Sequence, residues 1–292
     1  MKNSLADGLY LDLPNDEYHS DTAIGSSTLK VLATKTPAHY KGMVRKESAA
    51  FDFGSALHMA VLEPAKAALI VCGPDDRRGK KWTDAKEAAD AAGQILLTAS
   101  DYSEVMAARD AVLSNKDMQW LMRGKTMAEA SIFHTDATTG LRCKIRPDLV
   151  NHNLNIMADL KTCLSASPNA FSKAVLDYGY HIQNAFYERI WAGFNEWPVG
   201  SFLFVCVEKD PPYATAIYEL DMPTIAEGDN LVNIGLETYM TCQLTGEWPS
   251  YPSGIQKLRL PNYGFKTLDP SEFPPCGGEA KLGGLKVQCE EE

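Results

Sequence analysis

The residues with the clearest chemical potential lie between Ile145 and Thr162, in the run I-R-P-D-L-V-N-H-N-L-N-I-M-A-D-L-K-T. Asp148 lies near the end of one apolar segment, Asp159 lies eleven residues later within the next, and Lys161 follows two positions on. Two carboxylates on adjacent strands make the oxygen-rich site that Mg²⁺ or Mn²⁺ prefers. Side chains two apart share one strand face, so Lys161 adds a positive charge beside Asp159. The pattern indicates metal-assisted hydrolysis of a phosphodiester.

Strand-like runs must position these side chains. A tight connection at 151–153 predicts a hairpin between its two flanking runs, which would bring Asp148 and Asp159 onto neighbouring strands. The expected strands span residues 128–134, 141–150, 155–162, 201–208 and 214–220.

Helices are expected on either side of these strands. Ser167 as N-cap and Pro168 at the first helical position open a helix that should extend to about residue 194. It carries Gln183 and Tyr187 four residues apart and therefore on one face. The other expected helices run from residue 26 to before Pro37, from about 51 to before Pro64, on both sides of a break near 98–100 within 83–114, and from about 223 to 244.

Composition indicates a soluble globular protein. The chain has 292 residues, 45% hydrophobic and 23% charged, enough for a sizeable core. No apolar run approaches the roughly 20 residues of a membrane helix, and the start lacks the apolar segment of a signal peptide, so we expect a cytoplasmic protein without a membrane partner. The seven scattered cysteines include no C-x-x-C pair, which argues against structural zinc, an iron–sulfur cluster and a disulfide framework.

The formal net charge of −10 has the wrong sign for a protein that binds nucleic acid over its whole surface. Any DNA contact must therefore be local, and the basic segments 30–46 and 77–81 are candidates. Ser26, Ser27 and Lys30, at a predicted helix start, form a candidate pocket for a 5′-phosphate, with simple helix capping as an equal alternative.

The expected organisation is one domain over residues 1–268. It comprises a helical N-terminal lobe at about 26–115 and a catalytic core at about 125–245. Residues 269–292 carry little apolar periodicity and end in three glutamates, which predicts a mobile acidic tail.

Five motifs in this order resemble the PD-(D/E)XK nuclease superfamily, and within it the RecE-type exonucleases (exonuclease VIII), relatives of the RecB nuclease domain and of lambda exonuclease. The resemblance covers about residues 20–250. It implies an α/β fold, with a central mixed sheet flanked by helices and a helical N-terminal lobe. The motifs are G-x-x-x-H (Gly54, His58), the strand with Glu129, P-D (Pro147-Asp148), D-L-K-T (Asp159 to Thr162) and Q-x-x-x-Y (Gln183, Tyr187).

The resemblance also implies roles for single residues. Mg²⁺, with Mn²⁺ as a substitute, would be bound by Asp148, Asp159, the main-chain carbonyl of Leu160 and His58. Lys161 would position the attacking water and stabilise developing charge. Glu129, Gln183 and Tyr187 would complete the catalytic site. Taken alone, His58 could equally be a packed ring, Glu129 a solvent-facing residue, and Gln183 and Tyr187 ordinary helix packing.

The implied activity is that of a Mg²⁺-dependent exonuclease on double-stranded DNA. It would act from a free end, degrade the 5′-ended strand and leave a 3′ overhang for recombination with a single-strand annealing protein. Related enzymes form rings around DNA, so a homo-oligomeric ring is expected. Two alternatives stay open: another PD-(D/E)XK nuclease, Cas4-like or endonucleolytic, and a non-catalytic DNA-binding or interaction module on the same fold. Cas4-like enzymes carry a four-cysteine cluster, which the cysteine spacing here does not support.

Overall fold

The structure is a computed structural model that describes residues 4–43, 53–260, 281–282 and 285–286. It divides into two compact units, residues 1–250 and 251–292. In the second unit, the strands β11 (Lys281–Leu282) and β12 (Leu285–Lys286) form an antiparallel pair. Most of the predicted tail, 269–292, lies outside the described residues. No helix of the described residues is long and apolar enough to cross a membrane.

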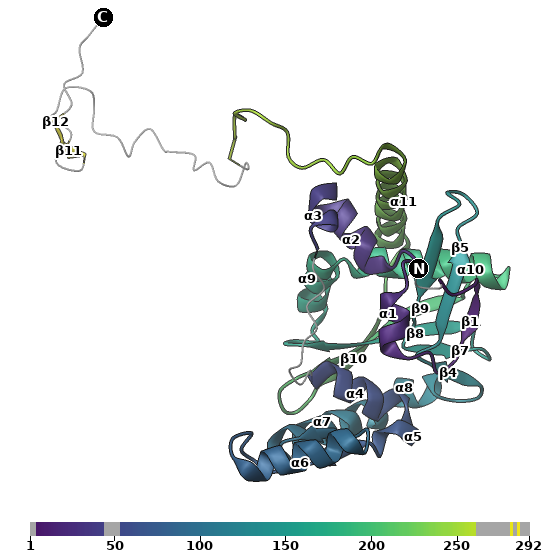
Figure 1. Cartoon of the computed structure of the whole chain (residues 1–292), viewed down its shortest axis with the longest axis vertical. Coiled ribbons are helices and arrows are strands. Elements are labelled where there is room, and N and C mark those ends of the chain that lie inside the picture. Colours follow the sequence, from purple (N-terminus) through teal and green to yellow (C-terminus); the bar gives the residue numbers. More distant parts are fainter. Residues whose placement is uncertain (1–3, 44–52, 261–280, 283–284, 287–292) are drawn as a thin grey trace, which may run out of the picture. The chain divides into compact units, whose positions relative to one another are not determined.

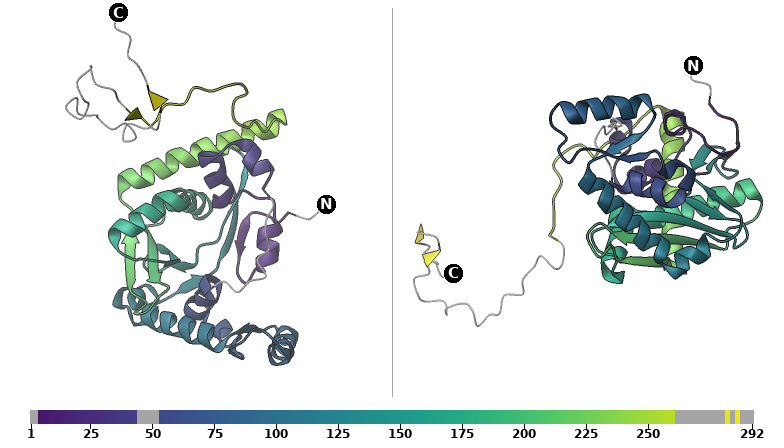
Figure 2. Two further views of the ribbon diagram at one scale, coloured as in Figure 1. Left: turned by 90° about the vertical axis from the view of Figure 1, so that its left-hand side faces the viewer. Right: turned by 90° about the horizontal axis from the view of Figure 1, so that it is seen from below.

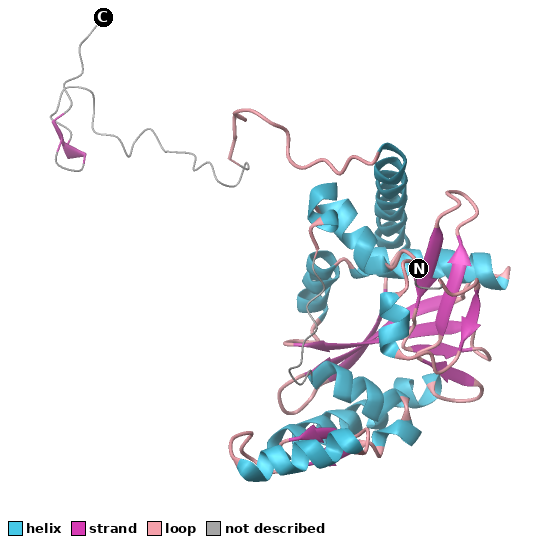
Figure 3. Ribbon diagram, in the orientation of Figure 1, coloured by secondary structure: helices cyan, strands magenta, loops and turns pink. Residues whose placement is uncertain are grey.

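A mixed five-stranded sheet forms the centre of the first unit (Figure 3). Only β8 and β9 are parallel, and the other neighbours are antiparallel. The predicted hairpin is confirmed, because β7 and β8 pair antiparallel around the turn at 152–155. In spatial order the strands are β10 (Thr215–Glu219), β9 (Ser201–Glu208), β8 (Ile156–Cys163), β7 (Leu149–Asn151) and β4 (Thr126–Ala128).

Helices cover both faces of this sheet, as the predicted fold class requires (Figures 1 and 2). On one face a core forms under α2 (Ser26–Thr34), α9 (Pro168–Tyr178), α10 (Tyr180–Asn195) and α11 (Met222–Thr245). On the other a second core forms under α4 (Phe53–Leu62), α7 (Ala99–Ser114) and α8 (Lys116–Leu121). The side chains of β8 alternate between the two cores: Met157 packs in the first, while Ala158 and Leu160 pack in the second. Asp159 therefore shares the face of Met157, toward α10.

A second, three-stranded sheet has the order β1 (Gly8–Tyr10), β5 (Ser131–Thr135), β6 (Arg142–Ile145), with α1 (Asn15–Ser20) after β1. Its existence corrects two predictions. The run 128–134 is not one strand, because Glu129 takes a left-handed backbone with φ of 50° and separates β4 from β5. The run 141–150 likewise divides at residues 146–148, where Pro147 lacks the N–H that a continuous ladder needs.

The long helix predicted from Pro168 to about residue 194 is two helices. Gly179, with φ of 62°, ends α9 in a left-handed conformation, and α10 begins at Tyr180. The predicted start of α9 is confirmed, with Ser167 at the N-cap and Pro168 opening the helix, although the Ser167 side chain makes no capping hydrogen bond. The capping prediction for α2 is wrong, because its N-cap is Gly25 rather than a serine.

The N-terminal lobe is mainly helical but contains two strands that the sequence analysis did not predict. β2 (Ile70–Cys72) and β3 (Ile95–Leu97) pair in parallel beside α4, and α6 (Lys80–Ala91) connects them. Three-residue apolar runs carry too little periodicity to be recognised as strands. The short helices α3 (Pro37–Lys41) and α5 (Pro64–Ala67) complete the first unit.

The contact between α10 and α11 depends on Gly228. A Cβ at this position would overlap the carbonyl oxygen of His181, so only glycine lets the helices approach this closely. We expect Gly228→Ala to destabilise the protein by about 1–3 kcal/mol, since backbone must move. Thermal unfolding would measure the loss. The neighbouring exposed substitution Glu227→Ala is the control, and equal melting temperatures for both variants would contradict this packing argument.

Candidate functional site

His58 links α4 to the central sheet. Its Nε2 lies 2.8 Å from the carbonyl oxygen of Leu160 on β8, and its Nδ1 lies 3.3 Å from Asp148 Oδ2. Leu57 and Val61 anchor the helix by packing in the core below. The His58 side chain therefore points at the strand that carries Asp159 and Lys161, rather than packing in an apolar environment.

Asp148 lies at the point where the second sheet passes into the central one. Its Oδ2 accepts a hydrogen bond from the Leu160 N–H at 2.7 Å, and its carbonyl oxygen accepts one from the Glu129 N–H at 3.1 Å. Leu149 pairs with Ala158, so the same register continued by one residue sets Asp148 opposite Asp159. The hairpin brings the two acids of the sequence motif to adjacent strands.

The side chains of His58, Glu129 and Asp148 form a cluster that could hold a metal ion. One ligand atom from each lies within 4.8 Å of the others, and the Leu160 carbonyl is beside them. Glu129 occupies the break between β4 and β5, with its Oε1 3.9 Å from His58 Nδ1. Its left-handed backbone is a strained conformation for a glutamate, which is a common feature of functional sites.

Asp159 lies in a polar network on the α10 side of β8, outside the cluster of His58, Glu129 and Asp148. Its Oδ1 accepts a hydrogen bond from Gln183 Nε2 at 2.7 Å, and its Oδ2 pairs with the Lys161 ammonium group. The same Oδ2 is buried and accepts no hydrogen bond from the described residues. Gln183 Oε1 in turn accepts from Lys161 at 3.3 Å and from Lys30 at 3.4 Å.

These observations test whether a divalent cation fits. The donors are carboxylates, a carbonyl and one imidazole, the hard set that suits Mg²⁺ or Mn²⁺. The buried Asp159 Oδ2 contacts the Lys161 ammonium group, so it supplies negative charge beside the cluster. The residues therefore fit: His58, Asp148 and the Leu160 carbonyl would hold the ion, with Asp159 on one side and Glu129 on the other.

Tyr187 and Arg146 support the loop that carries Asp148. The Tyr187 hydroxyl donates to the Arg146 carbonyl oxygen at 3.3 Å, and burial raises the pKa of Tyr187 well above its usual value, so the phenol stays protonated. The Arg146 guanidinium donates to Ser131 Oγ at 2.7 Å and lies over the ring of Tyr18. Tyr187 thus acts on the site through the backbone before Asp148.

A cleft of about 800 Å³ opens over these groups. Its walls include Ser26 and Ser27 at the start of α2, together with Glu129, Asp148 and Lys161. The predicted phosphate-binding Ser26 and Ser27 thus line the same space as His58, Asp148 and Leu160, whereas Asp159 is not part of its lining. Lys30 is half-buried beside Gln183, below the serines.

The residues of this cleft that sequence reasoning missed include Lys144, Arg146 and Tyr180. Lys144 is buried and donates to the carbonyl oxygens of Tyr18 and Asp21. Tyr180 lies under the ammonium groups of Lys161 and Lys30, at 4.6 and 5.3 Å from its ring centroid. One signal could have found it: Tyr180 precedes Gln183 by three residues and Tyr187 by seven, which is helical spacing on one face.

The site is electrostatically coupled. Burial lowers the pKa of His58, but the carboxylates of Asp148 and Glu129 outweigh it and raise the pKa to about 9. Burial and the charge of Asp159 raise the pKa of Asp148. Burial lowers the pKa of Lys161, yet Asp159 and Asp148 raise it above its usual value, whereas burial and the charge of Lys161 lower the pKa of Lys30 to about 8. Without metal, His58 therefore carries a proton that a bound cation would displace.

The raised pKa of Asp148 predicts a stability that depends on pH. Unfolding lets this carboxyl ionise near 3.8, whereas the folded protein holds its proton to about 7, so metal-free protein loses stability as the pH rises through this window. Asp148→Asn keeps an oxygen for the Leu160 amide and removes the ionisation. In a chelator we expect this variant to match the wild type at pH 4 and to exceed its stability at pH 8 by about 1–4 kcal/mol.

Denaturant unfolding at both pH values would measure this difference. With Mg²⁺ the order should reverse at pH 8, because a cation that binds only the folded wild type stabilises it. A stability difference that does not change with pH would show that Asp148 is not the titrating group.

The fold resembles that of a solved structure. A protein from Eubacterium rectale, named as a candidate exonuclease, superposes with a TM-score of 0.56 at 13% identity, over 82% of this chain and 89% of that one. A phage-related exonuclease from Haemophilus somnus 129PT gives a TM-score of 0.33 at 12% identity, over 77% of this chain and 96% of the other, which is too weak to bear on the fold. No curated protein matches the sequence significantly.

The family comparison covers the whole described site. The model of a family described as a PDDEXK-like domain of unknown function (DUF3799) matches residues 25–261, from the start of α2 to beyond α11. The match includes His58, the P-D of residues 147–148, the D-L-K of 159–161 and both helices of the α10–α11 pair. With a central mixed sheet and helices on both faces, the chain belongs to the PDDEXK-like family.

Proposed function

We propose that this protein is a divalent-metal-dependent exodeoxyribonuclease that degrades the 5′-ended strand of double-stranded DNA and leaves a 3′ overhang. One observation carries the proposal: His58, Asp148 and the Leu160 carbonyl meet at one point, with Asp159 and Lys161 on the adjacent face of the same strand. Within the superfamily, the order of the five sequence motifs favours a RecE-type exonuclease. The family match supports the nuclease class, and the finer assignment rests on the cleft.

The residues divide the chemistry among them. When bound, Mg²⁺ supplies Lewis acidity to a phosphate oxygen and to water. Asp148 and His58 would hold the ion, and Gln183 holds the carboxylate of Asp159 in place. Because the pKa of Lys161 is raised, its side chain stays protonated and serves as a positive charge and donor rather than as a base. It would orient the attacking water and stabilise charge on the phosphorus centre.

The direction of degradation rests on the start of α2. Ser26 and Ser27 offer hydroxyls in the cleft wall, and the first N–H groups of this nine-residue helix favour an anion. Lys30 lies one turn further, and its lowered pKa reflects burial beside another cation, a situation that an anionic ligand would relieve. These groups suit the 5′-phosphate of the strand that is cut.

The expected partners follow from the same proposal. A net charge of −10 leaves little general attraction for DNA, so a homo-oligomeric ring with basic residues facing a channel would help to retain the duplex. A single-strand annealing protein would receive the 3′ overhang. A phage or prophage recombination system in the cytoplasm is the setting in which such an enzyme acts.

Asp159→Asn should remove nuclease activity without unfolding the protein. The amide still accepts from Gln183 but no longer supports a cation or balances Lys161, so we expect cleavage to fall by more than about 100-fold. Release of nucleotides from a linear duplex in Mg²⁺ measures it, and Asp177→Asn, an exposed carboxylate on α9, is the matched control. Wild-type turnover in Asp159→Asn would refute the site.

End-labelled substrates test the mode of attack. We expect linear duplex with a 5′-phosphate to lose its 5′-ended strand, and the same duplex without that phosphate to react several-fold more slowly, because the phosphate binds at the α2 start. A closed circular duplex should stay intact. Cleavage of the circle would overturn the exonuclease proposal while leaving a nuclease, and no cleavage of any substrate would overturn both.

A further inference from the structure

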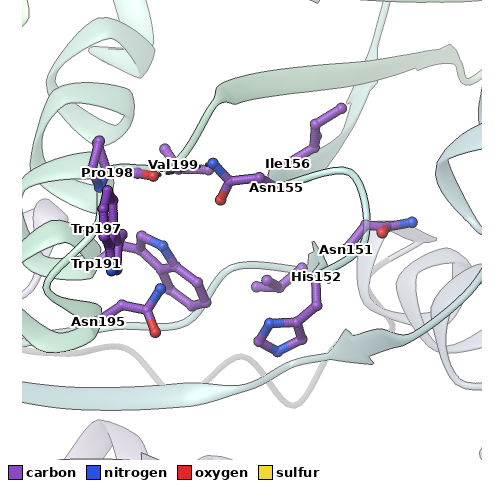
Figure 4. Close-up of a pocket in the computed structure, with 10 residues that line it drawn as sticks. Asn151, His152, Asn155, Ile156, Trp191, Asn195, Trp197, Pro198 and Val199 are labelled. Carbon is purple, nitrogen blue, oxygen red and sulfur yellow. Dashed lines mark hydrogen bonds between the residues drawn. The ribbon is translucent and has the colours of Figure 1, made fainter.

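A second pocket, of about 360 Å³, lies at the opposite end of β8 from the cleft (Figure 4). It forms between the turn that joins β7 to β8 and the segment that joins α10 to β9, and it falls within the size range of small-ligand sites. Its described lining contains no carboxylate and no lysine or arginine. The side chains that matter are Trp191, Trp197, His152, Asn155 and Asn195.

The walls of this pocket are fixed by hydrogen bonds. Asn155 Nδ2 donates to the Pro198 carbonyl at 3.2 Å, and the Gly200 N–H donates to the Asn155 carbonyl at 2.8 Å, so the two segments are tied together. Asn151 Nδ2 donates to the carbonyls of Leu121 and Arg123, and its Oδ1 accepts from the Leu154 N–H. A pocket built in this way loses little entropy when it takes a ligand.

The two tryptophans of the pocket make fewer interactions with the rest of the described protein than tryptophans usually do. Trp197 is 74% exposed, although a tryptophan gains most from burial. Trp191 is 3% exposed, and its indole Nε1 has no hydrogen-bond partner among the described residues. An unsatisfied buried donor is costly and usually marks a place that a ligand or a water completes. The His152 ring packs against Trp191 with centroids 6.1 Å apart.

These features suit a planar, uncharged heterocycle that stacks on indole and exchanges hydrogen bonds with amides. We propose that the pocket binds an unpaired nucleobase. Indole and imidazole rings supply stacking surfaces, and the Asn155 and Asn195 amides supply donors and acceptors for a base edge. Arg123 and Lys125, exposed on the loop bound to the β7–β8 turn, can meet the backbone phosphates.

The choice of a nucleobase among heterocycles rests on the proposed nuclease function. The pocket lies at the start of β8, beside Ile156, whereas Asp159 and Lys161 lie further on, about 10 Å or more along the strand. A base held here belongs to a strand outside the catalytic cleft, such as the one that is not cut. Binding in the pocket can therefore be lost without loss of cleavage.

Fluorescence anisotropy with the full-length protein in EDTA tests this inference. The probes are a labelled six-nucleotide thymidine strand and a labelled abasic strand of equal length and charge. We expect the base-bearing strand to bind about tenfold more tightly, and Trp197→Ala to abolish this preference. Trp197 is exposed, so its loss should not unfold the protein. Trp82→Ala, on α6 in the N-terminal lobe, is the matched control and should keep the preference.

Trp191→Phe adds a second variant, which keeps an aromatic ring and removes the N–H donor. Competition distinguishes the ligand source: displacement by free thymidine indicates a nucleoside site, and displacement only by strands indicates a site for single-stranded DNA. Equal binding of the base-bearing and abasic strands would overturn the inference, as would equal competition by phenylalanine amide, which would indicate a protein side chain.

Cleavage in Mg²⁺ separates this inference from the proposed function. Trp197→Ala should cut a short linear duplex at the wild-type rate, because Trp197 does not line the cleft that contains Asp148. A base preference in EDTA without any cleavage would support nucleobase binding in the pocket and refute the proposed nuclease activity. Cleavage without a base preference would support the nuclease activity and refute nucleobase binding in the pocket.

Discussion

The candidate site depends above all on the buried carboxylate of Asp148. This group binds the Leu160 amide, faces His58 and lies opposite Asp159, so it joins the N-terminal lobe, the β7–β8 hairpin and the polar network beneath α10. Burial and like charge raise the pKa of this carboxyl, which means that the metal-free fold bears a strain. A cation would relieve it. Such an arrangement is expected of a group selected for binding rather than for stability.

The site also requires that both faces of β8 are covered by a hydrophobic core. Its alternate side chains pack in the two cores, so the strand is fixed from both sides, and yet Asp159 and Lys161 occupy positions that would otherwise be apolar. The strand tolerates them because each finds a partner: Asp159 pairs with Lys161 and Gln183, and Lys161 also lies over Tyr180. Buried charges persist only when they are paired in this way.

The sequence predicted what depends on short-range pattern. The P-D and D-L-K spacing, the hairpin turn and the helix around Gln183 identified the neighbourhood of the site, because strand alternation and helical spacing are local rules. It could not show that the strands on either side of Glu129 belong to different sheets, since one residue in the left-handed region decides that. Nor could it show that Asp159 is held by Gln183 and Lys161, apart from the cluster of His58, Glu129 and Asp148, because those contacts form only when α4 and α10 pack on opposite faces.

Gly179 has two roles, because it lies between α9 and α10 and also contacts Lys30. A Cβ there would lie 3.2 Å from the Lys30 side chain and 3.3 Å from that of Ile182, so the hydrogen that glycine carries instead leaves room for the aliphatic stem of a cation. Gly179, which separates α9 from α10, therefore also leaves the space in which the Lys30 ammonium group approaches the Gln183 side chain. A side chain at position 179 would both strain the left-handed turn between α9 and α10 and displace Lys30 from its place beside Gln183.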